Sequence, residues 1–327
     1  MEALDLHDHV VDACAALLAG GDESSSWRLS EGWGLRTFEL GYWANGAHRN
    51  RPGAEGTPVP DLSPPDHPFH AIVKYAESLE ANGIDFLIVP IPGRLHVYPE
   101  RLPGIEQQAA DFRGVDVVLT RYLAALAEAG VEIVDLLPIF AEQRFTRSEA
   151  SDELLYHAFD RHWTPRGAKL AAQAIAARVR ALPWFEPGSL KESRDFVVER
   201  ERSPWISKKK ASLPEMEETV ELWFERVLRA SDRTPLLEVN RESPILILGD
   251  SFLNHLENEG AGVGSLLTAE LRQQVDRIAL GGGGSVAVWQ SLARRADGLV
   301  GKRVVIWLSS SDQLTDPRVR FVDLFAK

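Results

Sequence analysis

The chain has 327 residues, of which 44% are hydrophobic and 26% charged, so it can form one large globular domain or two modest ones. Its formal net charge of -12 argues against a nucleic acid or an anionic membrane surface as partner. The single cysteine, Cys14, excludes an internal disulfide and any multi-cysteine metal site, and we expect neither a metal nor a cofactor.

The N-terminal part predicts one helix followed by an irregular segment. Apolar residues recur at helical spacing over residues 4–19, and two glycines then end the pattern. Residues 22–68 are rich in Gly, Pro, Ser and Trp and lack periodicity, which predicts an irregular covering segment. Within it, Trp43 and residues 49–51 are candidates for a place near a cleft.

Targeting and membrane signals are absent from the sequence pattern. The first residues lack the basic and apolar regions of a secretory signal. No run of about eighteen apolar residues occurs, so we expect no membrane span. These two observations favour a cytoplasmic protein, and the alternative is a sequence that begins after a removed leader.

Helices and strands alternate in the next part of the chain. The pattern predicts helices over residues 70–82 and 114–129, each followed by a buried strand, at 84–90 and 131–136. Such alternation predicts a three-layer α/β fold, in which a mainly parallel central sheet has helices on both faces.

The second half continues this pattern around a charged insertion. Thr164 and Pro165 predict the start of a helix that runs to about residue 181. Residues 184–240 are highly charged and predict an insertion within a single domain of residues 1–327, with an acidic helix over 214–230. Its lysines at 208–210 suit a solvated surface or, alternatively, contact with an anionic substrate. Further on, the pattern predicts a helix over 266–274 and strands over 276–280 and 303–308.

Ser251 stands where a buried strand turns into a helix. The apolar run 244–248 is too short for a helix and is followed by Gly249 and Asp250. This arrangement places the Ser251 hydroxyl at the carboxyl edge of the sheet, where open α/β sheets bind ligands. An ordinary strand–turn–helix junction with an N-cap serine would have the same pattern.

Asp160 and His162 supply what a reactive serine needs. A serine hydroxyl requires a base to take its proton, and a histidine base requires a carboxylate to fix its tautomer. The two residues are two positions apart, so in extended backbone their side chains point the same way. One loop could therefore present both groups to Ser251, although such a pair is more often a surface feature.

The glycines at 281–284 follow the strand predicted at 276–280. Consecutive glycines let the backbone approach a ligand closely and direct its N–H groups toward it. A phosphate-binding loop is disfavoured, because no Gly-Lys-Ser/Thr sequence follows. The alternative is a flexible turn.

The two motifs, Gly249-Asp250-Ser251-Phe252 and Asp160-x-His162-Trp163, resemble the SGNH hydrolase superfamily. The order of the blocks, with Asp and His before Ser, is similar to the circularly permuted branch that contains the alginate O-acetyltransferases. The resemblance extends loosely over residues 70–180 and 240–310, including a proline-rich strand exit at 89–100.

This resemblance implies roles for individual residues. Ser251 would be the nucleophile, His162 the base and Asp160 the group that orients it. The N–H of Ser251 and one of Gly281, Gly282 and Gly283 would form the oxyanion hole, with Arg94 or Asn254 in place of the family's asparagine. The remaining candidates are three substrate-binding residues, His96, Tyr98 and Trp163. Trp163 could alternatively pack beneath the Asp/His loop and hold it.

The function implied by the resemblance is acyl transfer from a small-molecule donor to a hydroxyl acceptor, most simply O-acetylation of a carbohydrate. An esterase or a small-molecule biosynthetic acyltransferase is the alternative, because the same residues serve both reactions. A non-catalytic binding module on the same fold is a third possibility.

Overall fold

The computed structural model describes residues 3–20, 26–29, 33–45, 61–105, 116–144, 154–185, 195–206, 219–282, 284–316 and 318–325. Three features predicted above lie outside these residues. They are the segment 49–51, the lysines at 208–210 and Gly283.

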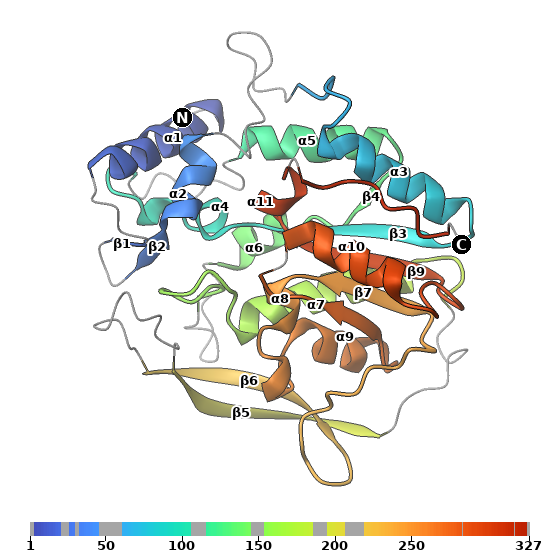
Figure 1. Ribbon diagram of the computed structural model, residues 1–327. Coiled ribbons are helices and arrows are strands. Elements are labelled where there is room, and N and C mark those ends of the chain that lie inside the picture. The colour runs from blue at the N-terminus through green and yellow to red at the C-terminus, as the bar shows by residue number, and fades with distance from the viewer. Residues whose placement is uncertain are drawn as a thin grey trace.

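A five-stranded parallel sheet forms the centre of the molecule, with the strand order β4-β3-β9-β7-β8 (Figure 1). Its strands are β3 (Asp85–Ile91), β4 (Glu132–Ile133), β7 (Ile245–Gly249), β8 (Asp276–Ala279) and β9 (Val304–Ser310). β9 pairs with both β3 and β7, so that Val304 lies opposite Asp85 on one side and Ile245 on the other. The strands whose loops carry the predicted site residues are therefore neighbours.

Helices cover both faces of this sheet, as Figure 1 shows. Alternate residues of β9 point to opposite faces, and Ile306 belongs to one buried cluster while Trp307 belongs to the other. The cluster around Trp307 also contains residues of α3 (Pro68–Glu80), α5 (Val117–Glu128) and α10 (Gly284–Arg294). The cluster around Ile306 contains residues of α7 (Pro165–Arg180) and α9 (Val263–Leu271). The predicted three-layer α/β fold is confirmed.

The remaining helices are shorter or lie at the N-terminal side. They are α1 (Ala3–Gly20), α2 (Thr37–Ala44), α4 (Arg94–Val97), α6 (Leu137–Gln143), α8 (Ser251–Asn254) and α11 (Ser311–Leu314). Among the described residues, no helix is long and apolar enough to cross a membrane.

The charged insertion is a β-hairpin where it is described, and the acidic helix predicted over 214–230 is wrong. Strands β5 (Phe196–Ile206) and β6 (Thr219–Arg229) pair antiparallel along their whole length. Opposite charges face each other across the pair, as in the register of Arg200 with Glu225. Leu222 and Phe224 are buried, whereas Glu221 is exposed and Trp223 and Glu225 are half-buried, which is the period-two alternation of a half-buried strand.

The segment 22–68 also contains more regular structure than predicted. Its described residues form a small antiparallel pair, β1 (Ser26–Arg28) with β2 (Gly34–Arg36), and then α2. The buried side chain of Trp43 lies in the main core. This part of the chain therefore packs against the sheet layers through a helix.

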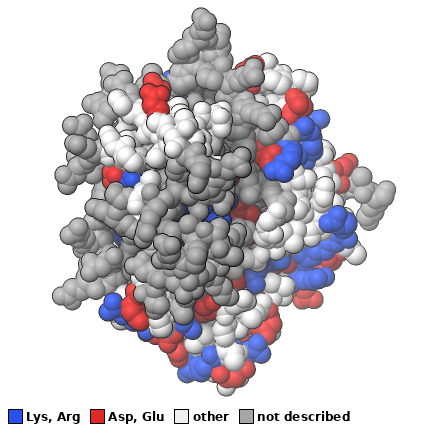
Figure 2. All heavy atoms as spheres, turned by 60° about the vertical axis from the view of Figure 1, so that its left-hand side comes forward, with Lys and Arg blue, Asp and Glu red and all other residues white. Residues whose placement is uncertain are grey.

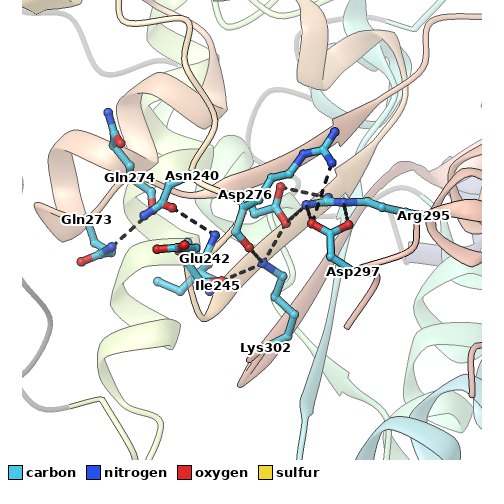
Figure 3. A network of polar contacts seen from close by, with 11 residues as sticks. Asn240, Glu242, Ile245, Gln273, Gln274, Asp276, Arg295, Asp297 and Lys302 are labelled. Carbon is cyan, nitrogen blue, oxygen red and sulfur yellow. Dashed lines mark hydrogen bonds and ion pairs between the residues drawn. The ribbon is translucent and has the colours of Figure 1, made fainter. Parts of the chain in front are cut away.

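A buried network of charges joins the amino ends of β7, β8 and β9 (Figure 3). Asp276 is fully buried at the start of β8 and accepts two hydrogen bonds from Arg295, of 3.0 and 2.7 Å. Lys302 lies 2.8 Å from the same carboxylate and also donates to the backbone carbonyls of Arg241 and Ser243. One carboxylate thus holds the segments that lead into three neighbouring strands.

We expect Asp276→Asn to lower the free energy of unfolding by roughly 3–5 kcal/mol, because a neutral amide leaves two cations without their buried counter-ion. Urea unfolding followed by circular dichroism measures this loss. Asp297→Asn is the matched control, since Asp297 also pairs with Arg295 but its side chain is 42% exposed. Equal losses in the two variants would contradict the role given to burial.

Candidate functional site

The predicted site residues meet at the carboxyl edge of the sheet. Ser251 follows β7, the strand that lies between β9 and β8. The glycine turn follows β8 on one side, and residues 309–312 end β9 on the other. The turn is joined directly to β7, because the N–H of Leu280 donates to the carbonyl of Gly249 over 3.0 Å.

The sequence around Ser251 explains its sharp turn into α8. A Cβ added to Gly249 would lie 2.8 Å from the Cβ of Leu253, so only glycine allows this close return of the chain. Asp250 is the N-cap, and its carboxylate accepts from the N–H of Phe252 over 2.9 Å. Its second oxygen accepts from the hydroxyl of Ser310 over 3.1 Å. The nucleophile candidate therefore stands on a rigid turn.

The loop that carries Asp160 and His162 is closed by its own backbone. The N–H of His157 donates to the carbonyl of His162 over 3.1 Å, and Tyr156 forms a β-bridge with Trp163. Thr164 then caps α7 as predicted, and its hydroxyl also donates to the carbonyl of Leu154. The loop is thereby fixed at both ends.

His162 lies between Asp160 and Ser251 in one chain of hydrogen bonds. Its Nδ1 donates to Asp160 Oδ1 over 2.6 Å, and its Nε2 accepts from Ser251 Oγ over 2.9 Å. Burial raises the pKa of the Asp160 carboxyl, but the hydrogen bond and charge of His162 outweigh it and hold that pKa far below its ordinary value. The three residues are therefore arranged so that an ionised carboxylate orients an imidazole toward the serine hydroxyl.

Arg94 and Tyr98 support this loop, and neither is placed as predicted. The buried guanidinium of Arg94 pairs with Glu39 and donates to the carbonyls of His157 and Ala158. The buried hydroxyl of Tyr98 accepts from the N–H of Leu155 over 2.9 Å. Both side chains position the Asp/His loop, which corrects the oxyanion role predicted for Arg94 and the substrate contact predicted for Tyr98.

Trp163 and His96 are also buried. Trp163 is fully covered and packs edge-on against Phe252 with ring centroids 5.0 Å apart. It therefore packs beneath the loop, which corrects the substrate-binding role predicted for it. His96 lies in the wall of a nearby cavity and is paired with the buried Asp116 at 3.1 Å. Its other nitrogen accepts from the N–H of Gly93.

Two of the predicted oxyanion candidates lie beside Ser251. A Cβ added to Gly281 would be 3.7 Å from the Cβ of Ser251 and 3.9 Å from Nδ2 of Asn254. Asn254 is exposed, one helical turn after Ser251 in α8. Gly282 has a φ of +77°, a left-handed conformation that favours glycine. Gly281 and Asn254 are thus the candidates that the structure brings close to the serine.

Sequence reasoning missed two histidines and a tryptophan at this site. The ring of His255 stacks on His162, with centroids 4.7 Å apart and planes 13° apart. Its Nε2 lies 3.2 Å from Nε2 of His157. Trp205, from the hairpin strand β5, stacks on His157 and meets His255 edge-on. The proximity of His255 to Ser251 in sequence was the one available signal.

Both additional histidines are held neutral. Burial is the largest cause in each case, and it lowers the pKa of His157 to about 4 and that of His255 well below its ordinary value. The charges of neighbouring histidines lower both further, whereas Asp160 opposes the shift. His162 therefore has an uncharged ring stacked against it at neutral pH.

These shifts predict that stability falls as the pH falls from 6.5 toward about 4. In that window the histidines are protonated in the unfolded chain but stay neutral in the folded protein. The free energy of unfolding should therefore fall by about 1 kcal/mol per pH unit for each histidine. Urea unfolding at about pH 7 and pH 5 measures the slope, which should be smaller in His157→Gln than in the wild type. The exposed His9, replaced by Gln, is the control. A slope unchanged by His157→Gln would contradict the prediction.

The hairpin that supplies Trp205 has a mixed surface. Figure 2 shows basic and acidic side chains interspersed on the described lower part of this face, where the hairpin lies. Several of them are ion pairs, such as Arg226 with Glu201 at 2.8 Å and Arg233 with Glu199.

Comparison with known proteins supports the resemblance given by the motifs. The model of a family described as SGNH hydrolase-like domain, acetyltransferase AlgX, matches residues 60–308. Alginate biosynthesis protein AlgX of Pseudomonas aeruginosa is 30% identical over 113 residues, which are 34% of this chain and 22% of that protein. Probable alginate O-acetylase AlgJ of the same organism is 30% identical over 102 residues, 31% of this chain and 24% of that protein. The matches thus span less than a quarter of these relatives' length.

Two solved structures share the fold. The O-acetyltransferase domain of Pseudomonas putida AlgJ superposes with a TM-score of 0.61 at 19% identity, covering 92% of this chain and 96% of that one. Pseudomonas aeruginosa AlgX has a TM-score of 0.58 at 19% identity, covering 90% of this chain and 65% of that one. Since the family model matches most of the sequence, the chain belongs to the SGNH hydrolase-like, AlgX-type acetyltransferase family.

Proposed function

We propose that the chain is a serine-dependent O-acetyltransferase that acts on a carbohydrate or a similar hydroxyl acceptor through an acetyl-enzyme. The observation that carries this proposal is the hydrogen-bonded line from Asp160 through His162 to Ser251, with 2.6 and 2.9 Å between the heavy atoms. Family membership supports acetyl transfer as the reaction class.

In the first half-reaction, Ser251 Oγ attacks the carbonyl carbon of an acetyl ester or thioester, and its proton passes to His162 Nε2. Asp160 stabilises the imidazolium that forms. The backbone N–H groups of Ser251 and Gly281, with the Asn254 amide, stabilise the tetrahedral oxyanion. When it collapses, the bond to the leaving group breaks, and that group takes the proton from His162.

In the second half-reaction, His162 removes the proton of an acceptor hydroxyl, whose oxygen attacks the acetyl carbon. Collapse of the second tetrahedral intermediate releases the acetylated acceptor, and His162 returns the proton to Ser251 Oγ. Water in place of the acceptor gives acetate, so the balance between transfer and hydrolysis depends on acceptor binding and water exclusion.

The test begins with p-nitrophenyl acetate and the intact mass of the protein. We expect one acetyl group per chain, located on Ser251 by peptide mapping. Addition of methyl glycosides should then divert acetyl groups from acetate to acetylated sugar, quantified by mass spectrometry.

Each alternative gives a different result. Acetate as the sole product with every acceptor would identify an esterase. No acetyl-enzyme and neither product, with a ligand that still raises the melting temperature, would identify a binding module. An acetyl group on another residue would refute the assignment of the nucleophile.

A further inference from the structure

A cavity with aromatic and carboxylate walls lies against the loop that carries Asp160 and His162, which contributes Arg161 to its lining. The cavity measures about 40 Å³ and is open to solvent. Helix α2 supplies Phe38, Glu39, Tyr42 and Trp43. The segments after β3 and β9 and the Asp160/His162 loop supply the rest. Phe38 is 43% exposed, so an aromatic face is available to a ligand at this position.

Arg161 connects this cavity with the reacting groups. It lies between Asp160 and His162 in the chain and lines the cavity. Its guanidinium carbon is 4.8 Å from the centre of the Phe38 ring and 5.3 Å from that of Phe252. The Phe252 ring is in turn 4.8 Å from that of His162. The Phe252 ring thus contacts both Arg161, in the cavity wall, and the His162 imidazole.

The charge of Arg161 is already compensated. Its Nη2 donates to Asp312 Oδ1 over 3.2 Å, and both side chains are 23% exposed. Among the described residues that line the cavity, Arg161 is the only lysine or arginine. The carboxylate of Glu39 is likewise neutralised, by Arg94 at 2.6 Å. The walls therefore offer donors and acceptors for hydroxyl groups but no surplus positive charge.

We propose that this cavity is the acceptor subsite, and that it takes a neutral, hydroxyl-rich ring in preference to a ring that carries a carboxylate. The apolar face of such a ring packs on Phe38, while its hydroxyls donate to Asp312 and accept from Arg161. A carboxylate at this place approaches Asp312 and must compete with it for the one guanidinium. The inference rests on the acetyl transfer proposed above.

The experiment compares methyl glucoside with methyl glucuronide as acceptors, using p-nitrophenyl acetate as donor and kcat/KM for the acetylated product as the readout. In the wild type we expect kcat/KM to be at least about tenfold higher for the glucoside than for the glucuronide. This factor corresponds to the free energy of one charge-assisted hydrogen bond. In Asp312→Asn, Arg161 loses its counter-ion and can pair with a ligand carboxylate. The ratio of glucuronide to glucoside should then rise about tenfold or more.

The ratio within one variant cancels any change in the acyl-transfer chemistry itself. Asp66→Asn, which removes a carboxylate with 70% exposure on the surface, is the matched control and should leave the ratio unchanged. A wild type that prefers the glucuronide, or an Asp312→Asn ratio equal to that of the wild type, would overturn the proposal.

Failure of the transferase itself gives a separate result. If the wild type acetylates neither sugar, ligand-observed NMR tests the cavity directly with the same two glycosides. Binding of the glucoside with weaker binding of the glucuronide, reversed in Asp312→Asn, supports the subsite without transfer. Equal binding of the two sugars by the wild type refutes it.

Discussion

Replacement of Ser251 by alanine is expected to lower turnover of p-nitrophenyl acetate by about 10⁴-fold or more, because no other group at this position can form the acetyl-enzyme. The hydroxyl lies 2.9 Å from His162 Nε2 and is the only part of the side chain that the substitution removes. Stopped-flow release of nitrophenolate measures both the burst and the steady-state rate. The burst should be abolished, and intact mass should show no acetyl increment.

The control is Ser78→Ala, a serine in helix α3 on the far side of the central sheet. It should retain the wild-type burst and rate. Circular dichroism and the unfolding midpoint of Ser251→Ala should match the wild type, since the change removes a single partly buried oxygen. A burst of normal amplitude from Ser251→Ala would refute the proposed mechanism.

Asp160→Asn is expected to cost about 10⁴-fold in kcat with a much smaller change in KM. The asparagine amide presents an N–H or a neutral oxygen to His162 Nδ1, so the imidazole loses both its fixed tautomer and the charge that stabilises its protonated form. The carboxylate makes a second bond that holds the loop, to the backbone N–H of His162 over 3.1 Å. Asparagine can also accept this hydrogen bond from the N–H of His162. The variant therefore removes the negative charge while keeping the bond that holds the loop.

The pH dependence provides a second readout for Asp160. The pKa of Asp160 in the folded protein lies below the ordinary value of 3.8. The stabilisation that ionised Asp160 provides is therefore complete above pH 3.8 and is lost as the pH falls below it. Changes in rate between about pH 5 and pH 8 should therefore not come from titration of Asp160. Asp8→Asn, on the exposed face of α1, is the control. A loss of less than about tenfold in Asp160→Asn would rule out an orienting role.

The strand–helix alternation and the two reactive motifs could be predicted because each depends on local sequence. Thr164 and Pro165 fix the start of α7 through capping and a restricted φ, and the short apolar run before Gly249 can only be a buried strand. The pairing of Ser251 with His162 was inferred from the chemistry of the two motifs together and from their resemblance to the SGNH hydrolase superfamily.

The parts that could not be predicted depend on distant partners. Nothing local marks Arg94 as the residue that pairs with Glu39 and holds the carbonyl of His157, because these contacts come from three separate segments. The stack of Trp205 on His157 depends on where the hairpin folds back against the sheet layers. The hairpin itself was missed because charged residues obscured the alternation of Leu222 and Phe224 with more exposed positions.

The ionic clamp formed by Asp276, Lys302 and Arg295 lies at the edge of the sheet opposite Ser251. Three strands are thus anchored at one end by interactions that take no part in binding a sugar or an acyl group. Loops at the other end, such as the turn at Gly281 and Gly282, contribute less to fixing the register of the strands. Under the proposed function, substitutions at that edge can change which acceptor is used without loosening the strands beneath it. We therefore expect sequence variation within the family to concentrate there.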